Sequence, residues 1–164
     1  MKDGQAGQQG KQMIPIEALY QDHRRALLGY LTKSFSWCGS PQDMLQETFL
    51  RALRQKERLQ EAVSPRAWLF GVARHVGLTA ARSRRPMQTL TESAAEAPRQ
   101  SPEIADLRDQ VEALPAAMRE ALELRLRDGL TYEEIAHVLQ IPVGTVRSRL
   151  HTAVTRLRQA MQDS

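Results

Sequence analysis

The chain has 164 residues and a formal net charge of +4, and 41% of its residues are hydrophobic, 26% charged and 5% aromatic. This balance is that of a soluble folded protein, and so few aromatic residues argue against most β-rich folds. A chain of this length forms one ordinary domain or two small ones, and we expect an all-α protein with a thin core in each half.

The first ten residues are polar and rich in Gly and Gln, without the apolar core of a signal peptide. No later stretch approaches the length of a membrane span, so we expect a cytoplasmic protein without membrane insertion. Cys38 is the single cysteine, which excludes an intramolecular disulfide and a cysteine-based metal site. We favour a buried or half-buried thiol over a redox sensor at this position.

Charge is distributed unevenly along the chain. Residues 1–85 contain 14 Lys and Arg against 7 Asp and Glu, a net +7, whereas residues 103–134 contain 4 against 9, a net −5. Residues 142–162 contain 4 basic residues and no acidic ones. Two basic regions therefore flank an acidic one. This layout suits contact with a polyanion at two separate places, with a merely solvated basic face as the ordinary alternative.

Apolar residues recur at helical spacing over residues 14–85 and again over 103–162, and we expect three or more helices in the first region and four in the second. Between them, residues 86–102 include three prolines and almost no large apolar side chain, which predicts a flexible linker. Residues 1–13 are predicted to form a disordered tail. We therefore expect two small helical domains that move independently in the free protein.

The second domain has the best-defined helix boundaries. Pro115 suits a first helical position and Gly129 suits the left-handed residue after a helix end, which predicts a helix over 115–127. Thr131-Tyr-Glu-Glu134 has the form of a capping box, so a short helix begins there and ends near residue 139. Gln140 follows in a tight turn where a glycine is common, and a positive φ there costs about 1 kcal/mol.

Pro142 opens the last predicted helix, in which Val146, Leu150, Ala153 and Leu157 share one buried face. With the short helix before it, this segment has the form of a helix-turn-helix, whose second helix enters the DNA major groove; a plain helical hairpin is the alternative. Arginines can bind guanine or phosphate, hydroxyls can donate to phosphate, and a helix N-terminus attracts anions. The candidate DNA-binding residues on the outward face are Gly144, Thr145, Arg147, Ser148, Arg149, His151 and Thr152.

In the first domain, residues 43–52 form an amphipathic pattern. Leu45, Phe49 and Ala52 share a buried stripe at helical spacing. Taken alone, the polar residues opposite this stripe are most simply a solvated face. These outward residues are Asp43, Gln46, Glu47 and Arg51.

A further helix is predicted to begin at Ser64 and Pro65, where serine can cap and proline can fill the first turn. Its expected core stripe contains Leu69, Val72, Ala73 and Val76, and Trp68 is expected to be a packed anchor rather than a base-stacking platform. A broad basic surface of this kind supplies salt-sensitive affinity for phosphates and suits strand-separated DNA. The basic residues are Arg66, Arg74, His75, Arg82, Arg84 and Arg85.

Several of these strings together resemble one family, the extracytoplasmic-function (ECF) group of sigma-70-type RNA polymerase sigma factors. Three strings are similar to region four of this family: Leu114-Pro115 with Arg119-Glu120, Asp128-Gly-Leu-Thr-Tyr-Glu-Glu-Ile-Ala136 and Ile141-Pro-Val-Gly-Thr-Val-Arg-Ser-Arg-Leu150. The string Asp43-Met-Leu-Gln-Glu-Thr-Phe-Leu-Arg-Ala52 is similar to the region-two helix that docks on the polymerase clamp. The resemblance covers roughly residues 16–157.

The resemblance implies region two over residues 14–85 and region four over residues 103–162. It implies that Asp43, Gln46, Glu47 and Arg51 bind the clamp, and that the helix after Ser64 melts and captures the proximal (minus ten) promoter element. Residues 144–152 would read the distal (minus thirty-five) element and contact the polymerase flap. His75 and Thr79 replace the family's usual Asn and Asp, which puts the preferred proximal base in doubt. Family members commonly have an anti-sigma partner and respond to stress or envelope signals.

Nothing in the sequence favours an enzyme. The four histidines fall on separate predicted helices without metal-ligand spacing, and there is no Gly-rich phosphate loop or nucleophile elbow. We expect no catalytic residue, no metal and no cofactor. The sequence predicts a factor that directs core RNA polymerase to specific promoters. The alternative is a stand-alone helix-turn-helix regulator that binds DNA without core polymerase.

Overall fold

The structure, a computed structural model, describes residues 13–84 and 101–163, and within these ranges it contains eight α-helices and no strand. The predicted all-α class is therefore confirmed. The predicted tail over 1–13, apart from Met13, and most of the predicted linker over 86–102 lie outside the described residues.

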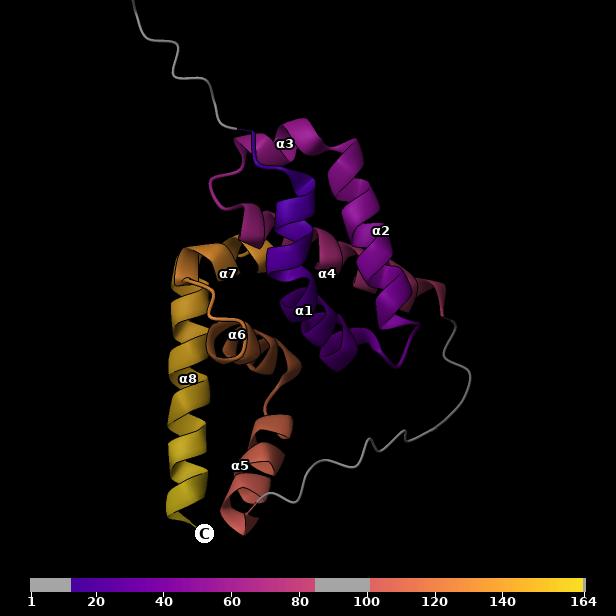
Figure 1. The fold of residues 1–164 in the computed structure, drawn as a ribbon. Coiled ribbons are helices and arrows are strands. Elements are labelled where there is room, and N and C mark those ends of the chain that lie inside the picture. Colours follow the sequence, from indigo (N-terminus) through magenta and orange to yellow (C-terminus); the bar gives the residue numbers. More distant parts are fainter. Residues whose placement is uncertain (1–12, 85–100, 164) are drawn as a thin grey trace, which may run out of the picture.

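The N-terminal unit is a bundle of three long helices with one short helix at its end (Figure 1). Helices α1, α2 and α4 each contact the other two, and their shared core includes Leu27, Tyr30, Leu69 and Phe70, all at most 1% exposed. The short α3 lies against α2 and α4. The helices are α1 (Ile16–Phe35), α2 (Pro41–Arg54), α3 (Lys56–Glu61) and α4 (Pro65–Ser83).

Two of these helices begin in the same way. Ser40 and Ser64 are N-caps in extended conformation, and a proline follows each as the first helical residue. The Ser40 Oγ accepts a hydrogen bond from the Asp43 N–H at 3.3 Å, and the Ser64 Oγ accepts one from the Ala67 N–H at 3.1 Å. Each cap satisfies one of the backbone donors that a helix N-terminus leaves free. The predicted start of α4 at Ser64 and Pro65 is confirmed.

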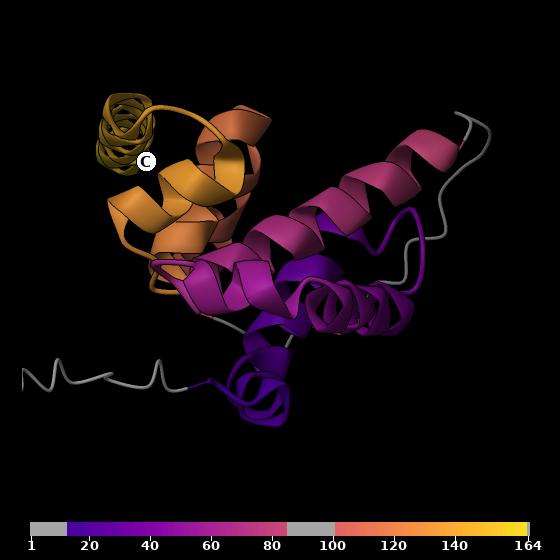
Figure 2. The ribbon, with the colours of Figure 1, turned by 90° about the horizontal axis from the view of Figure 1, so that it is seen from above.

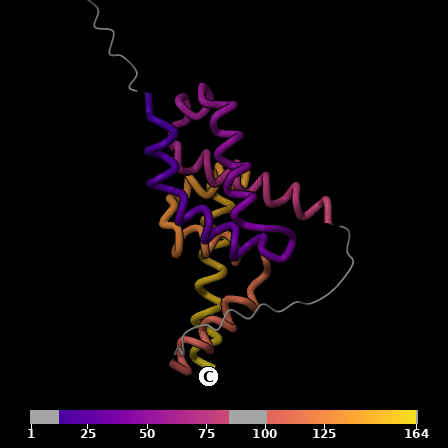
Figure 3. Tube along the Cα trace, turned by 45° about the vertical axis from the view of Figure 1, so that its right-hand side comes forward, coloured from indigo at the N-terminus to yellow at the C-terminus, as the bar shows by residue number. Residues whose placement is uncertain are grey.

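The C-terminal unit contains α6, α7 and α8 around a small core, with α5 alongside α8. Leu124, Leu130, Ile135 and Val146 are fully buried in this core, whereas no residue of α5 is fully buried. Figures 1 and 3 show that α5 and the last turns of α8 extend away from the N-terminal unit. The helices are α5 (Pro102–Glu112), α6 (Ala116–Leu126), α7 (Tyr132–Leu139) and α8 (Val143–Gln162).

The predicted helix-turn-helix geometry is present. The capping box of α7 is complete: the Thr131 Oγ1 accepts from the Glu134 N–H at 3.1 Å, and a Glu134 carboxylate oxygen accepts from the Thr131 N–H at 2.8 Å. Gly129 has φ +67°, and Gln140, which ends α7, has φ 53° and ψ 49°. Pro115 is the N-cap of α6 rather than its first helical residue, so that helix begins one residue later than predicted.

The two units contact each other directly, and the independent motion predicted for them in the free protein stays a prediction. Helix α7 packs against α4, and Figure 2 shows the two helices side by side. Side chains of opposite charge join the two units at several points, among them Arg66 with Glu134 and Arg74 with Glu120. The amino-acid composition of residues 86–102 could not predict these contacts, because they form between helices that lie on either side of that segment.

Two small buried groups complete the N-terminal unit. Cys38 is buried, as predicted, with its Sγ 3.2 Å from the Phe35 carbonyl oxygen. Burial raises the pKa of this thiol despite the nearby Arg84 guanidinium. Thr48 is fully buried, and its hydroxyl donates to the Met44 carbonyl at 2.8 Å. Both polar groups are thus satisfied within the fold.

Candidate nucleic-acid interface

Helix α8 presents the outward face that the sequence predicted. Val146, Leu150 and Ala153 are buried and Leu157 is half-buried, so this side of the helix packs against the core. Among the seven candidate residues, Gly144, Arg147, Ser148 and His151 are exposed, while Thr145, Arg149 and Thr152 are half-buried.

The arginines of α8 are free of acidic partners in the part of the chain that the structure describes, unlike Arg51, Arg66 and Arg74 of the N-terminal unit. Within the described residues, none of Arg147, Arg149, Arg156 and Arg158 forms an ion pair. Exposed cations without a partner in the fold are available to phosphates, and phosphate contacts supply most of the affinity in DNA binding. The α8 surface can therefore bind a polyanion without breaking an internal contact.

A second basic surface is a cleft of about 660 Å³ between α2, α3, α4 and α7. It brings together the predicted DNA-binding residues Arg74, His75 and Arg82, and adds Arg51 and Arg58. Sequence reasoning assigned Arg51 to a different surface and missed Arg58, because the position of α3 against α4 depends on tertiary packing. Four arginines and two histidines around one cleft favour binding of a phosphate backbone.

The remaining predicted basic residues do not lie in this cleft. Arg66 lies in the first turn of α4 with its Nη2 2.6 Å from a Glu134 carboxylate oxygen. Arg84 donates from its Nη1 to the Trp37 carbonyl. Arg85 lies outside the described residues. The hydroxyl of Thr79 donates to the His75 carbonyl at 2.9 Å, so it is directed back along the helix.

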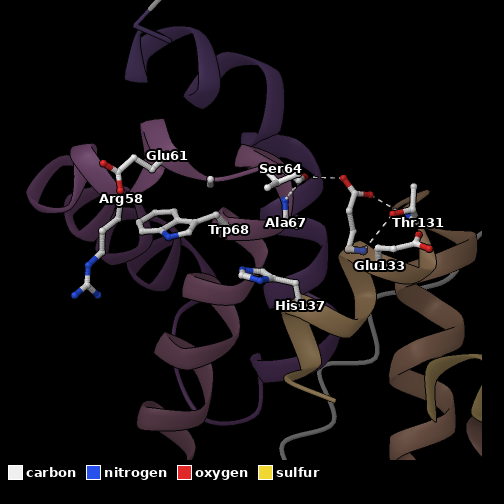
Figure 4. Close-up of a pocket in the computed structure, with 11 residues that line it drawn as sticks. Arg58, Glu61, Ser64, Ala67, Trp68, Thr131, Glu133 and His137 are labelled. Carbon is white, nitrogen blue, oxygen red and sulfur yellow. Dashed lines mark hydrogen bonds between the residues drawn. The ribbon is translucent and has the colours of Figure 1, made fainter. Parts of the chain in front are cut away.

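Trp68 borders both the basic cleft and a neighbouring, more apolar cleft of about 610 Å³. Figure 4 shows its indole beside Arg58, with His137 of α7 across the opening. The side chain is half-buried and packs against the core. Trp68 thus packs against the core, as the sequence predicted. Its exposed part lines the two clefts.

Helix α2 exposes a stripe of four residues at spacings of three, four and three. Asp43 and Gln46 are exposed, as predicted, and Leu50 and Leu53 continue the same stripe at 46% and 50% exposure. We refer to Asp43, Gln46, Leu50 and Leu53 as the α2 stripe. Single exposed leucines are ordinary, but two on successive turns beside polar residues indicate a contact surface. Sequence reasoning missed both, although their spacing from Gln46 would have placed them there.

The other two predicted clamp residues flank the α2 stripe and bind each other. The Arg51 Nε donates to a Glu47 carboxylate oxygen at 2.8 Å, an ion pair between residues four apart on one helix. Such a pair stabilises a helix by about 0.3–0.5 kcal/mol. The two side chains are therefore held in a fixed arrangement beside the stripe.

Other kinds of site are not found in the part of the chain that the structure describes. No group of three or more His, Cys, Asp or Glu side chains there could hold a metal ion. None of the helices there has the length and apolar character needed to cross a membrane.

The chain is similar to known proteins along most of its length. Residues 19–86 match the family description "Sigma-70 region 2", and residues 104–157 match "Sigma-70, region 4". RNA polymerase sigma-H factor of Pseudomonas aeruginosa is 34% identical over 90% of this chain and 86% of its own length. ECF RNA polymerase sigma factor SigL of Mycobacterium tuberculosis is 31% identical over 90% of this chain and 89% of its own.

Among solved structures, the sigma factor RpoE in complex with the anti-sigma factor NepR from Bartonella quintana has the same fold. The TM-score is 0.65 at 22% identity, covering 89% of this chain and 98% of that one. The two matched regions coincide with the two helical units, which contain the α2 stripe and the helix-turn-helix respectively. The chain belongs to the sigma-70 family of RNA polymerase sigma factors, in its extracytoplasmic-function group.

Proposed function

We propose that this protein directs core RNA polymerase to specific promoters and initiates transcription there, and that it performs no catalysis itself. One observation carries the proposal: a single chain combines an unpaired basic helix-turn-helix face on α8 with an exposed, partly apolar stripe on α2. A regulator that acts on DNA alone needs the first surface and has no use for the second.

Helix α8 reads the distal promoter element in this proposal. Arg147 is exposed near the helix N-terminus, where it can donate two hydrogen bonds to the O6 and N7 of a guanine in the major groove. Thr145 and Ser148 lie beside it and can donate to phosphate, which fixes the register of the helix on the duplex. Val146 and Leu150 hold the helix to the domain by the opposite side.

Helix α4 and its basic cleft bind the proximal element. Arg74 and Arg82 supply cations along one side of the helix, His75 lines the same cleft, and Trp68 lies at its edge. Single-stranded nucleic acid is typically bound by a basic groove combined with aromatic faces. This combination favours contact with the strand that is exposed when the duplex opens.

Helix α2 binds core polymerase through the α2 stripe together with Glu47 and Arg51. The half-exposed side chains of Leu50 and Leu53 offer apolar area that a partner can cover, and Asp43 and Gln46 offer polar contacts that fix orientation. This surface has no packing role, since Leu45, Phe49 and Ala52 hold α2 to the core from the other side.

An anti-sigma factor is a further partner in this proposal, and its release would follow a stress or envelope signal. The support is limited to the fold that this chain shares with a sigma factor whose structure contains an anti-sigma factor. The stand-alone regulator remains the alternative function, and it differs in one measurable respect, which is that it binds its sites without polymerase.

The test is to mix the chain with fragmented genomic DNA, with and without core polymerase, and to sequence the retained fragments. We expect a small set of enriched fragments only when core polymerase is present, because neither DNA-binding unit alone spans both promoter elements. Equal enrichment of the same fragments without polymerase would overturn the proposal in favour of the stand-alone regulator.

A further inference from the structure

One side chain of α3 is bound to the segment that leads into α1. The Gln60 Nε2 donates to the Ile14 carbonyl at 2.7 Å, and the Gln60 Oε1 accepts from the Ile14 N–H at 2.9 Å. Because the amide of glutamine has both a donor and an acceptor, it can pair with both polar groups of one backbone residue. Figure 1 shows the start of α1 beside α3. Gln60 therefore fastens the short α3 to the beginning of α1.

Helix α3 has few other means of keeping its position. It is six residues long, and a helix of this length is not stable by itself in water. No side chain caps its N-terminus, and Leu59 is its only fully buried residue. A helix attached through one buried side chain can still rotate about that point. The two hydrogen bonds between Gln60 and Ile14 add a second point of attachment, which fixes the rotation.

The position of α3 matters because this helix carries Arg58. The Arg58 side chain lines both the basic cleft and the neighbouring apolar cleft, and Figure 4 shows it beside the Trp68 indole. It is exposed and forms no ion pair within residues 13–84 and 101–163, so its charge is available to a phosphate. Whether Arg58 stays at the edge of the basic cleft depends on how α3 is held.

We propose that Gln60 is a positioning residue for DNA binding. By fastening α3 to Ile14, it holds Arg58 at the edge of the basic cleft, where Arg58 contacts the phosphate backbone of the proximal element. This inference rests on the proposed function of α4 and its basic cleft. Gln60 does not bind DNA itself, because both ends of its amide are bound to Ile14. Its effect on DNA binding passes through Arg58.

The test uses the full chain with Gln60→Leu, with Arg58→Ala and with both changes together. Leucine is close to glutamine in size and helix propensity, but it can form neither hydrogen bond. The matched control is Gln21→Leu, which makes the same change on α1 at an exposed side chain without a hydrogen bond to any other described residue. Arg82→Ala, an exposed position of α4 in the same cleft, tests the cleft independently of α3.

The affinity for a fluorescent single-stranded oligonucleotide of mixed sequence is measured by anisotropy between about 50 and 200 mM salt. One phosphate contact contributes about 0.7 to the slope of log K against log salt concentration, so its loss weakens binding about fivefold at 0.1 M salt. We expect this loss in Arg58→Ala. Gln60→Leu should bind about threefold more weakly, with a reduced salt slope, because Arg58 is then in place for only a fraction of the time.

The double variant should bind no more weakly than Arg58→Ala alone, because the two residues act through one contact. Gln21→Leu should stay within about twofold of the wild type. Thermal unfolding of each variant shows that it is folded at the temperature of the binding assay.

Each other outcome would count against the proposal. A role of Gln60 in stability alone would lower the melting temperature and leave the salt slope unchanged. If Gln60→Leu weakens binding further in a chain that already carries Arg58→Ala, its effect does not pass through Arg58. If Arg82→Ala weakens binding and Arg58→Ala does not, the cleft binds DNA without α3, and only this inference fails. Unchanged binding in both arginine variants would overturn the proposed function of the basic cleft, and this inference with it.

Discussion

Replacing Leu50 and Leu53 together by glutamine tests the polymerase-binding surface at its apolar part. The two side chains are 46% and 50% exposed, so about half of each is free for a partner to cover. Full burial of a leucine side chain contributes about 1.5–3 kcal/mol, and covering the free half of each contributes roughly 1 kcal/mol. Loss of both should weaken binding to core polymerase by about 2 kcal/mol, which is roughly a thirtyfold higher Kd.

The same variant should leave folding nearly intact. Glutamine has almost the helix propensity of leucine, and only the inner half of each side chain packs against the protein, so we expect the free energy of unfolding to change by less than about 1 kcal/mol. Core affinity is measured by fluorescence anisotropy with labelled protein, and stability by thermal unfolding. The control is Leu126→Gln, which makes the same change at a side chain 73% exposed on α6.

Wild-type core affinity in Leu50→Gln/Leu53→Gln, with an unchanged melting curve, would refute the reasoning, since it would leave the two exposed leucines without a partner on the polymerase. A loss of affinity that is matched by Leu126→Gln would also refute it, because the effect would then follow from any exposed leucine. A selective loss in the α2 variant is the expected result.

Further predictions concern DNA binding, core packing and pH. Arg147→Ala should weaken binding of the assembled polymerase to its promoters by about 1–3 kcal/mol in a filter-binding assay, with an unchanged melting temperature, because the side chain is exposed. Gly77→Ala should destabilise the fold by about 1–3 kcal/mol in chemical denaturation, since an added Cβ would lie 2.4 Å from a Phe35 ring carbon. Gly29→Ala, where nothing lies within 4 Å, should stabilise it by about 0.5–1 kcal/mol. The lowered pKa of Glu134 means that its contribution to stability is present above its ordinary value of 4.5 and disappears as the pH falls through the lowered pKa. Melting temperatures of wild type and Glu134→Gln should therefore converge once the pH has fallen below this lowered pKa, and a difference that persists in acid would contradict this assignment.

Local features of the fold were predictable from the sequence because they depend on neighbouring residues. The capping box of Thr131 and Glu134, the left-handed Gln140 and the start of α4 at Ser64 each follow from a few adjacent side chains, and the structure confirms them. The outward face of α8 was also predictable, since helical periodicity alone separates Val146 from Arg147.

The relation between the two units was not predictable in this way. Glu134 serves its own capping box and also binds Ser64, which is 70 residues away in the sequence, and no local pattern distinguishes these two roles. Arg51 was assigned by its position on α2 alone, whereas the structure shows that it also borders the basic cleft beside Arg74. Each of these contacts depends on how distant helices pack, which propensity and periodicity do not specify.

The function as a sigma factor is tested by transcription of fragmented genomic DNA with purified core polymerase, followed by sequencing of the RNA 5′ ends. Adding the chain to core polymerase should produce a set of discrete 5′ ends that share upstream sequence at two separated positions, and Arg147→Ala should reduce them. Leu50→Gln/Leu53→Gln should reduce them as well, unless the polymerase concentration is raised about thirtyfold. Transcripts that are the same with and without the chain would contradict its assignment as a promoter-directing subunit of RNA polymerase.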